Sequence, residues 1–227
     1  MESRARTGSS DSQVRLTQAE RSARTERRLL AAALELIAER GYGASSLAAI
    51  GARAGYSRGV VSHAFGSKGG LLAALVETMH ARWDHTQLQP AVGDRRGAEA
   101  LCAAIDAVRR QADEHPVEVR ALYTLLFEAL GPTPELRPRF AALHTRVRRG
   151  VERWIRAGLE HGEVDPEVDP AAQATLFVAA FRGTMYQWLL DPEHVDLERV
   201  FAEQKRAIRR ALAPRANDAP DSNGGTP

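Results

Sequence analysis

The segment from Ser45 to Lys68, SSLAAIGARAGYSRGVVSHAFGSK, predicts two short helices joined by a tight turn. A serine at the start of the first helix can accept a hydrogen bond from a free amide of the first turn. Gly55 tolerates the left-handed backbone that ends a helix, and Ser57 is placed to cap the helix that follows. Two short helices around a glycine-containing turn place one helix in the major groove of DNA. The segment therefore predicts a helix-turn-helix.

The residues on either side of this segment extend the pattern. An amphipathic helix and then Gly-Tyr-Gly at 41–43 precede it, and Phe-Gly-Ser-Lys at 65–68 leads into a leucine-containing helix. Over about residues 25–76 this order resembles the amino-terminal domain of the TetR/AcrR (tetracycline-repressor) family of bacterial transcriptional regulators. The residues that carry the resemblance are Gly41, Tyr42, Ser46, Ile50, Ala54, Gly55, Ser57, Gly59, Phe65, Ser67, Lys68, Leu71 and Leu72.

The chain as a whole is predicted to be all-α, because apolar residues recur at helical spacing and no window alternates as a strand does. Beyond the central segment, helices are expected at about 23–40, from 67 onward, and at 96–114, 116–130, 135–161, 169–190 and 195–213. The predicted domains are a disordered arm at 1–20, a three-helix DNA-binding domain at 21–67, a helical ligand-binding and dimerisation domain at 68–213, and a disordered tail at 214–227.

Charge is distributed unevenly along the chain. The net charge is +2, but residues 1–68 carry 11 Lys and Arg against 6 Asp and Glu, so the excess positive charge lies at the front. A basic front suits contact with phosphates. The single cysteine, Cys102, fits a reducing compartment. The longest apolar stretch, 174–190, is short of the ~20 residues that a membrane span needs. We expect a cytoplasmic, nucleoid-associated protein without a membrane partner.

Chemistry assigns roles to the residues at the start of the second short helix. The Arg58 guanidinium can bond O6 and N7 of a guanine together, and Gly59 and Val60 allow close approach and contact with a thymine methyl group. Lys68 is expected to present its charge to a phosphate, next to the partial positive charge of a helix start. Ser46 is expected to play the same part for the first short helix.

The resemblance adds two residues and raises two questions. Ser62 stands where the family commonly has a tyrosine that touches a phosphate, so a serine contact there is expected to be weaker, with His63 beside it adding a further contact. Ala48 stands where an arginine or another polar residue is common, which puts base contacts from the first helix in doubt. The operator is expected to be double-stranded DNA with pseudo-palindromic sequence.

The helices at about 169–190 and 195–213 are expected to form a homodimer. The first is apolar nearly all the way round, and a helix without a polar face must be covered on every side. The second has one apolar stripe. A two-fold four-helix interface would cover both helices. The alternative is a monomer in which the first of them is a fully buried central helix.

The domain at 68–213 is expected to bind a small, largely apolar effector, because the resemblance implies a cavity between its helices. Arg182 is unusual, since it is a charge within a strongly apolar helix. It is expected either to pair with an acid across the dimer, such as Glu128 or Glu203, or to meet a ligand carboxylate or phosphate. The candidate lining residues are Trp83, Ile105, Tyr123, Leu126, Phe127, Trp154, Phe177, Phe181 and Arg182.

An enzyme is the rival class, and it lacks the necessary motifs. Glu77 and His80 form one Glu-x-x-His step, but a di-metal helical bundle needs two such steps. The sequence has no nucleophile elbow, phosphate-cradling loop or cysteine pair. We therefore predict no catalytic residue, metal or cofactor. A helical adaptor that binds only protein is the remaining alternative, and it leaves the basic front without a role.

Overall fold

The computed structural model describes residues 17–131 and 133–215 and is built from helices. In chain order they are α1 (Gln18–Ala44), α2 (Leu47–Ala54), α3 (Arg58–Phe65), α4 (Lys68–Trp83), the π-helical turn η1 (Asp84–Leu88), α5 (Gln89–Val92), α6 (Gly97–Glu114), α7 (Pro116–Glu128), the 3-10 turn η2 (Pro134–Leu136), α8 (Arg137–Glu160), α9 (Pro170–Leu190) and α10 (Leu197–Leu212). The predicted all-α class is confirmed, and each predicted helix is present with its ends shifted by a few residues.

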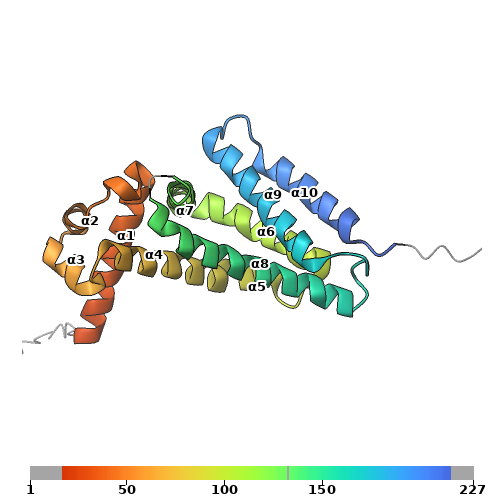
Figure 1. Cartoon of the computed structure of the whole chain (residues 1–227), viewed down its shortest axis with the longest axis horizontal. Coiled ribbons are helices and arrows are strands. Elements are labelled where there is room, and N and C mark those ends of the chain that lie inside the picture. The colour runs from red at the N-terminus through yellow and green to blue at the C-terminus, as the bar shows by residue number, and fades with distance from the viewer. Residues whose placement is uncertain (1–16, 132, 216–227) are drawn as a thin grey trace, which may run out of the picture.

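The molecule is elongated, with α2 and α3 at one end and α9 and α10 on the opposite part (Figure 1). We call α1–α3 with the start of α4 the head, and the remaining helices the body. Two clusters of buried residues follow this division. One joins α1–α4 to the inner face of α7 and the start of α8, and the other joins α5 to α10. Helix α7 therefore contributes buried residues to both clusters.

The first helix begins earlier than the sequence suggests. Thr17 caps it with a complete capping box, in which Thr17 Oγ1 accepts from the Glu20 amide at 3.2 Å and Glu20 accepts from the Thr17 amide at 2.7 Å. Helix α1 thus enters the stretch predicted as the disordered arm at 1–20. The remainder of that arm, and residues 216–227 of the predicted tail, lie outside the described residues.

The single cysteine of the chain lies in the core of the body. Cys102 is 3 % exposed in α6, and burial raises the pKa of its thiol. No single helix among the described residues is both long and apolar enough to cross a membrane. Only α3 taken together with the segment Lys68–Val92, across a bend of 66°, meets those two requirements.

Candidate DNA-binding surface and ligand cavity

The predicted helix-turn-helix is present, and its turn has the expected backbone. Gly55 is left-handed, with φ 79° and ψ 29°. Ile50 of α2 and Val61 of α3 are almost fully buried, which fixes the angle between the two helices. Ser46 caps α2 by accepting from the Ala49 amide at 3.1 Å. Ser57 differs from the prediction: its backbone is extended as in a cap, but its side chain makes no capping hydrogen bond.

The residues predicted to contact DNA lie on the outer side of this unit. Arg58, Gly59 and His63 are exposed on α3, as is Ser46 before α2, whereas Val60 and Ser62 are partly buried. Because Val61 points into the core, the side of α3 that carries these residues faces away from the protein.

Another arginine of the head is held by acids of α1. The Arg53 guanidinium lies 2.8 Å from Glu39 and 3.2 Å from Glu35. These ion pairs tie α2 to α1, and they leave Arg53 less available for DNA. Arg58 takes part in no ion pair with the described residues. The base contact predicted for Arg58 stays a prediction, and its guanidinium is not held by an acid as that of Arg53 is.

The Lys68 ammonium contacts other residues of the head, whereas we expected it to point into solvent. Its Nζ donates to the Gly43 carbonyl at 3.1 Å and lies 4.1 Å from the centroid of the Tyr42 ring. Burial lowers the pKa of this ammonium. An ammonium has three donors, and the bond to the Gly43 carbonyl uses one of them. Donors therefore remain for a phosphate, and the phosphate contact at Lys68 stays a prediction.

A junction between head and body, unnoticed in the sequence, is formed by Glu128 at the end of α7. Its carboxylate accepts from the backbone amides of Tyr42 at 2.9 Å and Gly43 at 3.3 Å, and from the Thr133 hydroxyl at 3.3 Å. Gly41, with φ 83° and ψ 166°, breaks α1 and turns these amides toward α7. We call this contact the Glu128 latch. A single glutamate at a helix end gives no sequence signal for a partner 86 residues away.

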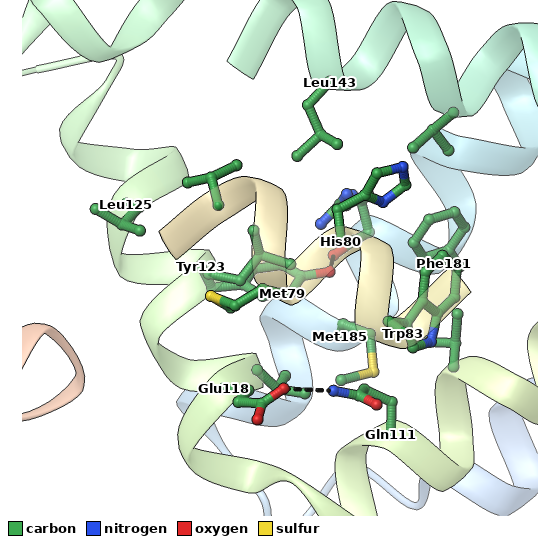
Figure 2. Close-up of a pocket in the computed structure, with 16 residues that line it drawn as sticks. Met79, His80, Trp83, Gln111, Glu118, Tyr123, Leu125, Leu143, Phe181 and Met185 are labelled. Atoms are coloured by element: carbon green, nitrogen blue, oxygen red, sulfur yellow. Dashed lines mark hydrogen bonds between the residues drawn. The ribbon is translucent and has the colours of Figure 1, made fainter. Parts of the chain in front are cut away.

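The body contains a mostly apolar cavity of about 110 Å³ between α4, α6, α7, α8 and α9 (Figure 2). Trp83, Tyr123, Phe181 and Arg182 line it, as the sequence analysis anticipated. Sequence reasoning missed the remainder, because a helical pattern marks a side chain as inward without saying whether it meets a void. The missed lining residues are Val76, Met79, His80, Val108, Gln111, Glu118, Val119, Leu122, Leu125, Leu143, Val147 and Met185.

The other five candidates lie elsewhere. Leu126 and Phe127 line a wider groove outside the cavity, of about 580 Å³, which shares Tyr123 and Arg182 with it. We call it the outer groove. The three remaining candidates pack into the core of the body and do not line the cavity, since they lie on faces of α6, α8 and α9 that turn toward neighbouring helices. They are Ile105, Trp154 and Phe177.

Besides Tyr123 and Arg182, the cavity has polar side chains in two places. Glu118 forms an ion pair with Arg82 and accepts from Gln111 Nε2 at 3.2 Å, the contact dashed in Figure 2. His80 lines the same cavity as Leu143 and Phe181. Burial lowers the pKa of His80, with a smaller contribution from Arg146.

His144, which lines the outer groove, predicts an acid-sensitive fold. Burial, reinforced by Arg182 and Arg148, lowers its pKa from 6.5 to about 4, and its Nε2 is buried without a partner. Between pH 6.5 and about pH 4, the unfolded chain therefore binds a proton at His144, whereas the folded chain keeps this imidazole neutral. The free energy of unfolding is therefore unaffected by this group above pH 6.5, and it decreases as the pH falls from 6.5 toward 4.

Allowing for the partial exposure of the ring, the loss amounts to about 1–2 kcal/mol. Urea unfolding measures the free energy of unfolding at neutral and at mildly acidic pH. The decrease between the two pH values should be smaller in His144→Gln than in the wild type by this amount. The exposed His85→Gln is the control and should follow the wild type. Equal pH dependence in all three proteins would contradict the assignment.

The two residues of the Glu-x-x-His step have different surroundings. Glu77 pairs with Arg146 at 3.0 Å, whereas His80 lines the cavity. Throughout residues 17–131 and 133–215, no three His, Cys, Asp or Glu side chains gather in a way that could hold a metal ion.

These features define a class: helical DNA-binding proteins with a helix-turn-helix head and a body that contains a cavity. Residues 29–75 match the model of the bacterial regulatory proteins of the TetR family, and residues 97–213 match that of the BetI-type transcriptional repressor C-terminal domain. The second match alone covers more than half of the chain. The protein belongs to the TetR family of bacterial transcriptional regulators; it is not an enzyme.

Individual relatives agree with this membership. The chain is 29 % identical over 199 residues to the HTH-type transcriptional regulator BetI 1 of Chromohalobacter salexigens, covering 86 % of this chain and 93 % of that protein. Over 66 residues it is 44 % identical to the regulator CymR of Pseudomonas putida, covering 29 % of this chain and 32 % of that protein. A SmeT–triclosan complex is similar at 25 % identity with a TM-score of 0.73, covering 85 % and 93 % of the two chains; SmeT is the repressor of a multidrug efflux pump in Stenotrophomonas maltophilia.

Proposed function

We propose that this regulator is a repressor that binds a pseudo-palindromic operator as a dimer. A small, largely apolar molecule in the body then releases it from DNA. The observation that carries the DNA half of the proposal is the start of α3, where the exposed Arg58 has no acidic partner among the described residues and Val61 anchors the helix. The cavity supports the ligand half, as does the similarity to SmeT, a repressor whose structure is known with triclosan. The protein would act in the cytoplasm, where the DNA lies.

The dimer is supported by an apolar stripe on α9 that the single chain leaves uncovered. Helix α9 buries one side against its own body, yet Leu176 is 62 % and Leu190 is 68 % exposed, and Tyr186 is also exposed. Small residues complete the stripe at helical spacing. An apolar stripe of this kind marks an interaction site, and a second copy would cover it through a two-fold interface with α10. We call it the dimer face: Ala172, Leu176, Ala179, Gly183, Tyr186 and Leu190.

Arg58→Ala is expected to reduce base discrimination. A bidentate arginine contributes about 1–3 kcal/mol of discrimination per base pair, so operator affinity should fall while affinity for scrambled DNA changes little. The operator is first selected from a randomised duplex library. Fluorescence anisotropy on the selected and scrambled duplexes, across a salt series, then measures both affinities.

Two further variants calibrate this experiment. Lys68→Ala should weaken binding to both duplexes and flatten the salt dependence, since a phosphate contact carries no sequence information. Arg110→Ala removes an exposed arginine of α6 and should behave as the wild type. If Arg58→Ala keeps full discrimination, the role assigned to Arg58 is wrong. If the wild type selects no sequence, the protein-binding adaptor becomes the better reading.

A further inference from the structure

Arg182 is a cation at the boundary between the cavity and the outer groove, and it lacks an acidic partner. It lies on α9 and lines both spaces. Within the described ranges its guanidinium makes no ion pair, and its Nε is buried without a hydrogen-bond partner. The Tyr123 and Phe181 rings lie beside it, with centroids 5.7 and 5.3 Å from Cζ. Such ring contacts replace only part of the hydration that a guanidinium loses on burial.

The acid of the cavity is already neutralised. Glu118 is paired with Arg82 and accepts a hydrogen bond from Gln111. The titratable side chains nearer Arg182 are Tyr123, His80 and His144. Burial raises the pKa of Tyr123 and lowers that of both histidines, so none of the three supplies a negative charge. The Arg182 charge is therefore uncompensated from within the cavity.

The acids suggested as partners across the dimer are engaged elsewhere. Both carboxylate oxygens of Glu128 are bound in the latch to the head. Glu203 forms an ion pair with Arg206 on its own helix. Bringing Glu128 or Glu203 of a partner subunit to Arg182 would disturb one of these contacts, whereas a bound anion needs no such rearrangement.

We propose that the effector carries a carboxylate, bound by Arg182, on a compact apolar body. This rests on the proposed ligand-responsive function and specifies its ligand class. A guanidinium binds a carboxylate through two parallel hydrogen bonds, and it attracts neither an alcohol nor an ammonium in this way. The apolar body would pack against Met79, Trp83 and Met185. The cavity is smaller than the ~300–1,000 Å³ of common ligand pockets, which favours a compact molecule.

The test compares three headgroups on the same apolar body. The full-length wild type is titrated with octanoate, octanol and octylammonium, and with phenylbutyrate, phenylbutanol and phenylbutylammonium. Binding is followed by calorimetry and by tryptophan fluorescence, since Trp83 lines the cavity. In at least one series the carboxylate should bind about ten-fold or more tightly than its alcohol, because a hydrogen bond to a charged group has roughly that effect. The ammonium should bind weakest.

Variants then assign the preference to the guanidinium. Arg182→Gln should bring carboxylate affinity down to the level of the alcohol and leave alcohol binding nearly unchanged. Arg182→Lys keeps the charge and should retain part of the preference for the carboxylate. It provides the test if the Gln variant folds poorly. Arg149→Gln, an exposed arginine of α8, is the matched control and should bind as the wild type.

Several results would overturn the proposal. They are a carboxylate that binds no better than the alcohol in both series, absence of carboxylate binding in both, and unchanged carboxylate binding by Arg182→Gln. Sedimentation of Arg182→Gln adds one more, since loss of the dimer with carboxylate binding intact would make the arginine a subunit-pairing residue. Because these titrations contain no DNA, they remain separate from a failure of operator binding, which would count against the proposed function instead.

Discussion

Leu176→Arg is expected to produce a monomer and to weaken operator binding by about 100-fold or more. Leu176 is 62 % exposed in the single chain, so the arginine costs little in the isolated fold. In a two-fold interface each copy brings its own arginine, which places two like charges in an apolar contact. Loss of the dimer removes the gain from binding two half-sites at once, which is on the order of 10²–10⁴.

Sedimentation velocity at micromolar concentration measures the first effect, and anisotropy on the selected operator measures the second. Val117→Arg is the control, because Val117 is also a large apolar residue, 45 % exposed, but on α7. It should remain a dimer with full affinity. A dimeric Leu176→Arg protein would show that the interface lies elsewhere, and a monomeric wild type would refute the dimer altogether.

Gly41→Ala is expected to destabilise the protein by about 3–5 kcal/mol and to loosen the head from the body. The backbone of Gly41, with φ 83° and ψ 166°, lies in a region that only glycine adopts readily, at a cost of about 1–3 kcal/mol for other residues. A Cβ atom there would also lie 2.3 Å from Glu128 Oε1. The carboxylate must then move away from the amides of Tyr42 and Gly43, and each charged hydrogen bond contributes about 1.5–3 kcal/mol.

Thermal unfolding should show a decrease in Tm of about 10 °C, from roughly 2–4 °C per kcal/mol for a chain of this size. Hydrogen exchange should show faster exchange at the two latch amides. Gly43→Ala is the matched control, since a Cβ atom at Gly43 meets nothing within 4 Å. Glu128→Ala completes a double-mutant cycle with Gly41→Ala: if the clash is with Glu128, the double variant costs less than the sum of the two. Strict additivity would contradict the latch.

Much of the fold was predictable because the signals are local. The helix-turn-helix follows from the serine at 46, the left-handed Gly55 and inward residues such as Val61, all within one short segment. Proline and glycine mark most helix ends of the body. The start of α1 was placed too late because the capping box of Thr17 and Glu20 lies in an otherwise polar stretch that resembles a disordered arm.

The lining of the cavity was predictable only in part, because it depends on how the helices are rotated relative to one another. Phe177 and Phe181 are one turn apart on α9, yet only Phe181 meets the cavity. Arg182 was singled out by its charge in an apolar helix. Its lack of an acidic partner among the described residues depends on where Glu118 and Glu128 find theirs, which a single sequence does not reveal.

Because its single cysteine, Cys102, is buried, this protein is convenient for site-directed spin labelling. Cys102 is the single cysteine of the chain, 3 % exposed, and burial raises the pKa of its thiol, so thiol reagents should leave the native protein unmodified. A cysteine introduced at the exposed His63 would then carry one spin label per subunit. The distance between two such labels in a dimer would report how far apart the recognition helices stand, with and without effector.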